Sequence, residues 1–331
     1  MALTRQGARL FLLQACCCVA ETSADVTVNG AVCAVAAALR DRVRFSVLGG
    51  RETLPRSLGS IYAMLVLLFL GSRFKGSVAH TFVLPPNLAN DICAALSRDG
   101  ARLFVTASGG FTASPLHVLR MRDGRRLQQL GSYGARPLQF RYPRRIWVAA
   151  DGFVFVVDHT NNRIQVLTPQ LAFHDFIGSK HLTEPVCVCA DDAVIVVGEF
   201  RDRISVFERT RGTLVRSFRC DGGACGVCLM PNRRHIAAVQ VTKHRVAVFS
   251  LEGELRRVVG QGKLSWIRDV ACSTHGELVV ADDSDVVVFT PCGDLYRRIP
   301  LHQRCSSVCV LQDTLFTIVR RDGTNVCVGF I

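Results

Sequence analysis

The sequence of 331 residues lacks an apolar run long enough to form a membrane-spanning helix. Its most apolar run is Ile61–Leu70, ten residues that end at Gly71 and are followed by Arg73 and Lys75. A spanning helix needs about 20 apolar residues. We therefore interpret the run as a buried central strand with Ser77–Leu84 as its neighbour. A membrane-associated segment is the alternative.

Sequence motifs of the common enzyme classes are also missing. The sequence contains no phosphate-binding loop, no Gly-x-Ser-x-Gly turn, no His-Glu-x-x-His and no dinucleotide-binding fingerprint. A catalytic triad is recognised by geometry and leaves no fixed spacing in a sequence. From the sequence we expect no catalytic residues, no cofactor and no metal site.

Cysteine is abundant, with 15 residues, but it forms no metal-binding pattern. Cys225-Gly-Val-Cys228 is a CxxC pair that no second CxxC or zinc-spaced histidine pair completes. A free cysteine behaves as a small buried hydrophobe, so we expect these side chains to pack inside the fold. We read Met1 as lying in or beside a strand, and expect free thiols in a reducing compartment, the cytoplasm.

Lysine is scarce, and arginine supplies almost all of the positive charge. The chain has four Lys and 36 Arg among its 40 basic residues, and its net charge is +13. Arginine binds phosphate and carboxylate groups through a planar fork. Compositional bias also raises Arg together with Ala, Gly and Val. The charge allows salt-sensitive attraction to nucleic acid or anionic membranes without establishing either.

One stretch, residues 147–178, reads as four short strands joined by tight turns. Apolar runs and an alternating polar-apolar segment predict the strands, which are Trp147–Ala150, Phe153–Asp158, Arg163–Leu167 and Ala172–Ile177. Asp151-Gly152 and Thr160–Asn162 are turn sequences. Four antiparallel strands in about 40 residues have the size of one propeller blade.

The same unit repeats along the chain. Arg163-Ile164 recurs at intervals of 40, 42 and 40 residues, as Arg203-Ile204, Arg245-Val246 and Asp285-Val286. A fixed period with constant internal order indicates a repeat fold. We predict an all-β propeller of four-stranded antiparallel blades, with regular blades over residues 88–331. Residues 2–11 resemble 95–104, and 31–58 resemble 193–218, so residues 1–87 are expected to form divergent blades. The expected number of blades is seven, with six as the alternative.

The repeat is similar to that of the NHL-repeat propeller family. The residues that fall on the family's pattern are Asp151, Gly152, Asp158, Asn161, Asn162, Arg163, Ile164 and Val166. The resemblance implies a non-enzymatic scaffold, since NHL modules often recognise substrates within tripartite-motif and RING-type ubiquitin ligases. The chain carries no RING-like run of Cys and His, so any role in ubiquitination would be that of a partner subunit or a relic.

Basic residues gather at equivalent turns of successive blades. Equivalent turns of a ring lie on one face, so we expect a candidate interaction face formed by Arg201, Arg203, Lys243, His244 and Arg245. A protein partner is the first prediction. RNA is the alternative partner, and it is secondary because few aromatic residues accompany these arginines. The second alternative is a metal-dependent propeller hydrolase or lyase. It would need matching carboxylates in every blade, whereas the residues vary: Asp158, Glu199, Val241 and Asp282.

Overall fold

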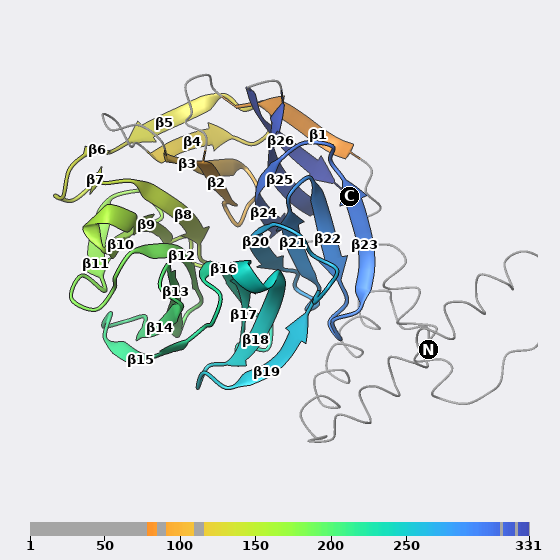
Figure 1. Ribbon diagram of the computed structural model, residues 1–331. Helices are drawn as coiled ribbons and strands as arrows, with labels where there is room; N and C mark the ends of the chain where they lie inside the picture. The colour runs from red at the N-terminus through yellow and green to blue at the C-terminus, as the bar shows by residue number, and fades with distance from the viewer. Residues whose placement is uncertain (1–77, 85–90, 109–115, 312–313, 322–323, 331) are drawn as a thin grey trace, which may run out of the picture. The chain divides into compact units, whose positions relative to one another are not determined.

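The computed structural model describes residues 78–84, 91–108, 116–311, 314–321 and 324–330, all within a compact unit that spans Gly76–Ile331. These residues form six four-stranded antiparallel sheets arranged as the blades of a ring (Figure 1). The prediction of an all-β propeller is therefore confirmed. The run Ile61–Leu70 and the similarities noted within residues 1–77 lie outside the described residues. No helix in the described part is long and apolar enough to cross a membrane.

Each blade runs from an inner to an outer strand in chain order, except the last. Blade 1 contains β2 (Asp91–Leu96), β3 (Arg102–Ser108), β4 (Leu116–Arg120) and β5 (Arg126–Leu130). Blade 2 contains β8 (Pro143–Val148), β9 (Val154–Asp158), β10 (Arg163–Leu167) and β11 (Phe173–Ile177). Blade 3 contains β12 (Pro185–Ala190), β13 (Val194–Glu199), β14 (Arg203–Glu208) and β15 (Leu214–Arg219).

Blades 4 and 5 follow the same order, whereas the outer strand of blade 6 comes from the other end of the described chain. Blade 4 contains β16 (Ala224–Leu229), β17 (His235–Gln240), β18 (Arg245–Ser250) and β19 (Leu255–Val259). Blade 5 contains β20 (Ile267–Cys272), β21 (Leu278–Asp282), β22 (Asp285–Phe289) and β23 (Leu295–Pro300). Blade 6 contains β24 (Cys305–Leu311), β25 (Thr314–Arg321), β26 (Thr324–Phe330) and β1 (Val78–Val83). Two short strands, β6 (Ser132–Tyr133) and β7 (Gln139–Phe140), and the 3₁₀ turns η1 (His159–Asn161) and η2 (Val241–Lys243) lie between strands.

The ring closes by joining distant parts of the chain. Strand β1 pairs antiparallel with β26, so residues near position 80 complete the blade that the carboxyl-terminal strands begin (Figure 1). Inner strands β2 and β24 contact each other, as do all other neighbouring inner strands. This contact leaves no gap for a further blade between the first and the last. The expectation of seven blades is wrong for the described residues, and the alternative of six is confirmed.

The hydrophobic core lies between adjacent blades. Successive residues of a strand point to opposite faces of the sheet, so each blade packs on both neighbours. In β9, Phe155 and Val157 pack against β12 and β13 of blade 3, whereas Val154 and Val156 pack against blade 1. The Val- and Ile-rich strands of the sequence are thus buried on both faces, as strands of a closed ring must be.

Candidate interaction surface

Two sets of loops meet at one end of the ring, which we call the connector face. One set joins consecutive blades, at residues 131–142, 178–184, 220–223, 260–266 and 301–304. The other set joins the second and third strands of a blade, at residues 159–162, 200–202, 241–244 and 283–284. Backbone hydrogen bonds link the two sets, for example from the Phe200 N–H to the Glu184 carbonyl at 3.1 Å. The opposite end, the hairpin face, carries the other turns.

In blade 2, part of the NHL-like pattern builds the connector face, namely Asp158, Asn161, Asn162 and Arg163. Asp158 is fully buried and accepts hydrogen bonds from the Arg141 backbone N–H at 2.7 Å and from Arg163 Nε at 2.7 Å. Asn161 Nδ2 donates to both Asp158 oxygens at 3.0 and 2.9 Å. Asn162 has φ of 55°, a left-handed conformation that Asn tolerates well. These polar residues therefore hold the turn in place.

Asp151 and Gly152 lie on the hairpin face instead, in the turn between β8 and β9. Asp151 Oδ1 accepts the Phe153 N–H at 3.2 Å, and Arg209 pairs with the same carboxylate. Gly152 has φ of 87°, which a glycine adopts without steric cost. The sequence pattern of blade 2 thus combines residues from both ends of the ring.

The equivalent of Asp158 varies between blades, in agreement with the sequence, but one position is corrected. In blade 3 it is Glu199, which accepts the Thr183 backbone N–H at 2.8 Å, and in blade 5 it is Asp282, which accepts the Trp266 N–H at 2.7 Å. In blade 4 the residue is Gln240, not Val241, because Gln240 pairs in register with Arg245 as Asp158 pairs with Arg163. Asp158, Glu199 and Asp282 each anchor a connecting loop, whereas Gln240 accepts a hydrogen bond from Arg245 of its own blade.

Two of the predicted face residues have structural partners. Arg203 Nε donates to Glu199 Oε1 at 2.8 Å, and Nη2 donates to the His181 carbonyl at 2.8 Å. The hydrogen bond that Arg203 donates to Glu199 raises the pKa of Arg203. Arg245 Nε donates to Gln240 Oε1 at 2.6 Å. Both arginines therefore fasten turns, although Arg203 keeps 38% of its side chain exposed.

The other predicted face residues point outward from the turns. The side chain of Arg201 is 77% exposed, with Nε 3.5 Å from a Glu184 oxygen. Lys243 Nζ lies 3.7 Å from an Asp221 oxygen. His244 is exposed and has φ of 50°, so it ends η2 in a left-handed conformation. The structure thus places all five predicted residues on the connector face, over blades 3 and 4.

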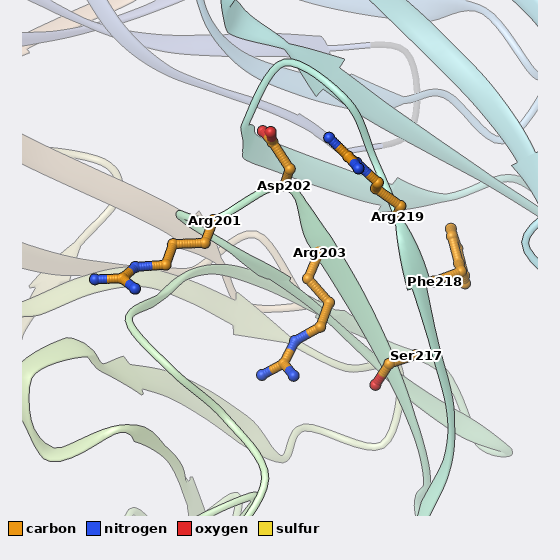
Figure 2. Close-up of a pocket in the computed structure, with 6 residues that line it drawn as sticks. All are labelled: Arg201, Asp202, Arg203, Ser217, Phe218 and Arg219. Carbon is orange, nitrogen blue, oxygen red and sulfur yellow. The ribbon is translucent and has the colours of Figure 1, made fainter.

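A shallow hollow of about 450 Å³ lies within this region (Figure 2). Figure 2 shows three arginines around it together with Asp202, Ser217 and Phe218; the arginines are Arg201, Arg203 and Arg219. Arg219 Nε lies 2.5 Å from Asp221 Oδ1, and Asp202 accepts the Gly222 N–H at 3.1 Å.

Carboxylates offset most of the positive charge around the hollow. Five cations (Arg201, Arg203, Arg219, Lys243 and Arg245) lie among four carboxylates (Glu184, Glu199, Asp202 and Asp221). Exposed ion pairs of this kind attract a further anion weakly. The cluster is therefore far closer to neutral than its arginine content suggests.

Buried polar side chains fill the centre of the ring. Arg145 of β8 forms an ion pair with Asp269 of β20 and donates to the Arg268 carbonyl at 2.5 Å. Since blades 2 and 5 are three apart in a ring of six, this pair spans the central axis. Asp269 also accepts Ser307 Oγ at 3.0 Å. The only carboxylate in this cross-axis group is thus fully engaged in hydrogen bonds.

The cysteines of the inner strands are unpaired thiols. Cys187 and Cys228 are buried, as expected from the sequence, and burial raises the pKa of each well above its usual range. Burial also raises the pKa of Cys225 to about 12. The Cys225–Cys228 pair is therefore part of the packing. Among the residues that the structure describes, no group of three or more His, Cys, Asp or Glu could hold a metal ion.

Three exposed aromatic residues on the connector face were missed by the sequence analysis. Tyr133 is 48% exposed, Phe200 is 64% exposed and Trp266 is 56% exposed. They lie in a connecting loop, a strand-to-strand turn and another connecting loop. The sequence feature that could have identified them as exposed is their position outside the alternating strands, next to turn residues.

No protein-family model matches the chain, and no curated protein is significantly similar to it. The fold and the surface geometry are therefore the grounds for a functional proposal.

Proposed function

We propose that this protein is a non-enzymatic propeller scaffold that binds a protein partner on its connector face. The observation that carries the proposal is the exposure of Tyr133, Phe200 and Trp266 on that one face. Tyr and Trp dominate the residues that supply most of the binding energy in protein interfaces. All three rings are open to solvent on the same face, where a partner would bury them.

The centre of the ring supports a binding role. An enzyme with its active site at the axis of a propeller needs charged groups that are free to act there. In this ring, Arg145 and Asp269 neutralise each other at the axis. The face loops, in contrast, are anchored by buried side chains such as Asp158 and Asp282. Loops on a rigid scaffold bind with a small loss of conformational entropy.

The sequence resemblance extends this proposal to a family. Asp158, Asn161 and Arg163 act together in one turn, which supports placing the chain with the NHL-repeat propellers. A recognition module linked to ubiquitin ligase pathways, acting as a partner subunit, is the finer form of the proposal. The free thiols of the described cysteines fit a reducing compartment, and we propose the cytoplasm.

The test is a crosslinking capture from native lysate with the full chain as bait. The bait variant replaces the three exposed aromatic residues by alanine (Tyr133, Phe200 and Trp266). The matched control replaces three exposed aliphatic residues of outer strands by alanine (Leu127, Val215 and Leu255), which are 50 to 52% exposed. Capture is repeated with nuclease and at two salt concentrations.

We expect proteins that survive nuclease to be recovered with the wild type and with the control, and lost with the aromatic variant. Recovery that vanishes with nuclease or modest salt would replace the protein partner by nucleic acid. Equal recovery with all three baits would show that the connector face is not the binding surface.

A further inference from the structure

The strongest local excess of positive charge lies outside the predicted face. Between Asp123 and Asp151 the sequence contains no acidic residue and six arginines: Arg125, Arg126, Arg136, Arg141, Arg144 and Arg145. This segment includes residues 131–142, the longest connection between two blades. We call residues 131–142 the β5–β8 loop. It lies on the connector face at the boundary of blades 1 and 2 (Figure 1).

Buried contacts hold the β5–β8 loop in one conformation. Strands β6 and β7 pair within it, and Phe140 is completely buried. The Leu138 N–H donates to Gln165 Oε1 at 3.1 Å, and Asn161 Nδ2 donates to the Gly134 carbonyl at 2.8 Å. Gly131 has φ of 88°, and a Cβ there would lie 2.7 Å from a backbone oxygen. The loop is thus ordered before any partner binds.

Arg141 of the loop and Arg144 at the start of β8 lie over aromatic rings and pair with no carboxylate of the described residues. Arg141 Cζ lies 5.5 Å from the centre of the Tyr133 ring, and Arg144 Cζ lies 5.5 Å from the Tyr142 ring. Arg136 is exposed. In the described part of the chain, no carboxylate lies within ion-pair distance of Arg136, Arg141 or Arg144. Arg141 is exposed, so stacking leaves its guanidinium N–H groups available to donate to an anionic partner, whereas the Nε of Arg144 is buried.

We propose that the β5–β8 loop, through Arg136 and Arg141, recognises an acidic segment of a protein partner. The inference rests on the proposed function and names the chemistry of the partner. Charge complementarity selects it, since the side chains of Arg136 and Arg141 form no ion pair with a described carboxylate, whereas Arg201 and Arg219 already have carboxylate partners. A guanidinium fork binds a carboxylate with two parallel hydrogen bonds.

The stacked rings favour acidic protein over RNA. Single-stranded RNA is held by bases that stack on open aromatic faces. Arg141 and Arg144 already lie over Tyr133 and Tyr142. The loop therefore presents guanidinium groups and not open aromatic faces, and a short cluster of carboxylates matches the guanidinium groups of Arg136 and Arg141.

The test measures binding of labelled probes to the full chain by fluorescence anisotropy. The probes are a peptide of about ten residues rich in Glu and Asp, the same peptide with Gln and Asn in their place, and a single-stranded RNA of about ten nucleotides. The loop variant combines Arg136→Gln with Arg141→Gln. It keeps the hydrogen bond from the backbone N–H of residue 141 to Asp158. The matched control is Arg201→Gln with Arg219→Gln on the same face. Thermal unfolding checks that both remain folded.

We expect the acidic peptide to bind, the amide peptide to bind at least about tenfold more weakly, and the loop variant to lose about tenfold in affinity for the acidic peptide. The control should change by less than about twofold. Equal losses in both variants, absence of acidic-peptide binding, or tighter binding of RNA than of the acidic peptide would each overturn the inference. If the loop variant binds like wild type while the aromatic variant still loses captured proteins, the inference fails and the proposed function stands.

Discussion

Replacement of Asp158 by alanine should destabilise the ring strongly, although Asp158 touches no partner. Its carboxylate is fully buried and accepts hydrogen bonds from the Arg141 N–H, Asn161, Arg163 and Gln165, at 2.7 to 3.1 Å. The Arg163 side chain is only 9% exposed. Removal of one partner from a buried ion pair leaves an uncompensated charge and costs about 3–5 kcal/mol.

For a domain of this size, each 1 kcal/mol shifts the unfolding temperature by about 2–4 °C. Asp158→Ala should therefore lower Tm by roughly 6–20 °C. The assay is calorimetry or circular dichroism of the full chain, with chemical unfolding to check that the slope with denaturant is unchanged. Addition of Arg163→Met to the same variant should restore about 2 kcal/mol, because the isolated charge is removed.

The control for this prediction is an exposed ion pair. Arg233 and Asp192 form a salt bridge with side chains 60% and 70% exposed. Asp192→Ala should cost no more than about 1 kcal/mol. If Asp158→Ala lowers stability no more than Asp192→Ala does, the buried network does not hold the turn, and the argument that anchored loops make this face rigid is refuted.

Three further predictions concern packing, thiols and pH. Gly198→Ala adds a Cβ 2.8 Å from a backbone oxygen of the next blade and should lower the free energy of unfolding by about 1–3 kcal/mol. At Gly262 nothing lies within 4 Å of an added Cβ, so Gly262→Ala should lower the free energy of unfolding by about 1 kcal/mol through the positive φ alone. Near pH 8, iodoacetamide followed by peptide mapping should label exposed Cys292 quickly and buried Cys228 only after denaturation; fast labelling of Cys228 would contradict the packing. Burial lowers the pKa of His117 below its ordinary 6.5. Below about pH 6.5 the unfolded state therefore binds more protons at this side chain than the folded state does, and folding stability is lost as the pH falls through the folded pKa. Above about pH 6.5 that stability is retained. His117→Leu should therefore reduce the drop in Tm between about pH 7.5 and about pH 5.5; an unchanged drop would exclude His117 as its cause.

The repeat and the strand order could be predicted because they follow from local pattern. The Arg-Ile pair at Arg163 and its copy at Arg203 each begin the third strand of a blade, β10 and β14. Alternating apolar residues fix which side chains face the neighbouring blades. These features depend on residues close in sequence, so the period was sufficient to place them.

Ring closure and register could not be predicted from the same pattern. Val78–Val83 pairs with β26, about 250 residues further along the chain, and no local signal assigns such a strand to a blade. Because this strand completes the last blade and does not belong to a further one, the described residues form six blades and not the expected seven. The shift from Val241 to Gln240 in blade 4 has a related cause, because intervals of 40 and 42 residues leave the alignment of turn residues uncertain by one position.

The electrostatics of the surface could not be predicted for a further reason. Arg201 lies near Glu184 and Arg219 near Asp221, and the first of these pairs comes from separate loops. A count of arginines in one turn therefore overstates the charge that a partner would meet. The acid-free segment between Asp123 and Asp151 was visible in the sequence, but its importance depended on the finding that Arg141 rests on a tyrosine.

The blade with the clearest repeat signature also supports the most divergent loop. Asp158 holds the Arg141 backbone, and Gln165 donates to the Gln139 carbonyl at 2.5 Å and accepts the Leu138 N–H. These hydrogen bonds reach from the regular turn of blade 2 into the β5–β8 loop. A long insertion costs little loop-closure entropy, but it binds well only when it is ordered beforehand. The signature residues therefore do more than shape a repeat: they fix a connection whose arginines, Arg136 and Arg141, have no carboxylate within ion-pair distance in the described part of the chain. This couples the stability of blade 2 to the recognition that we propose at the connector face.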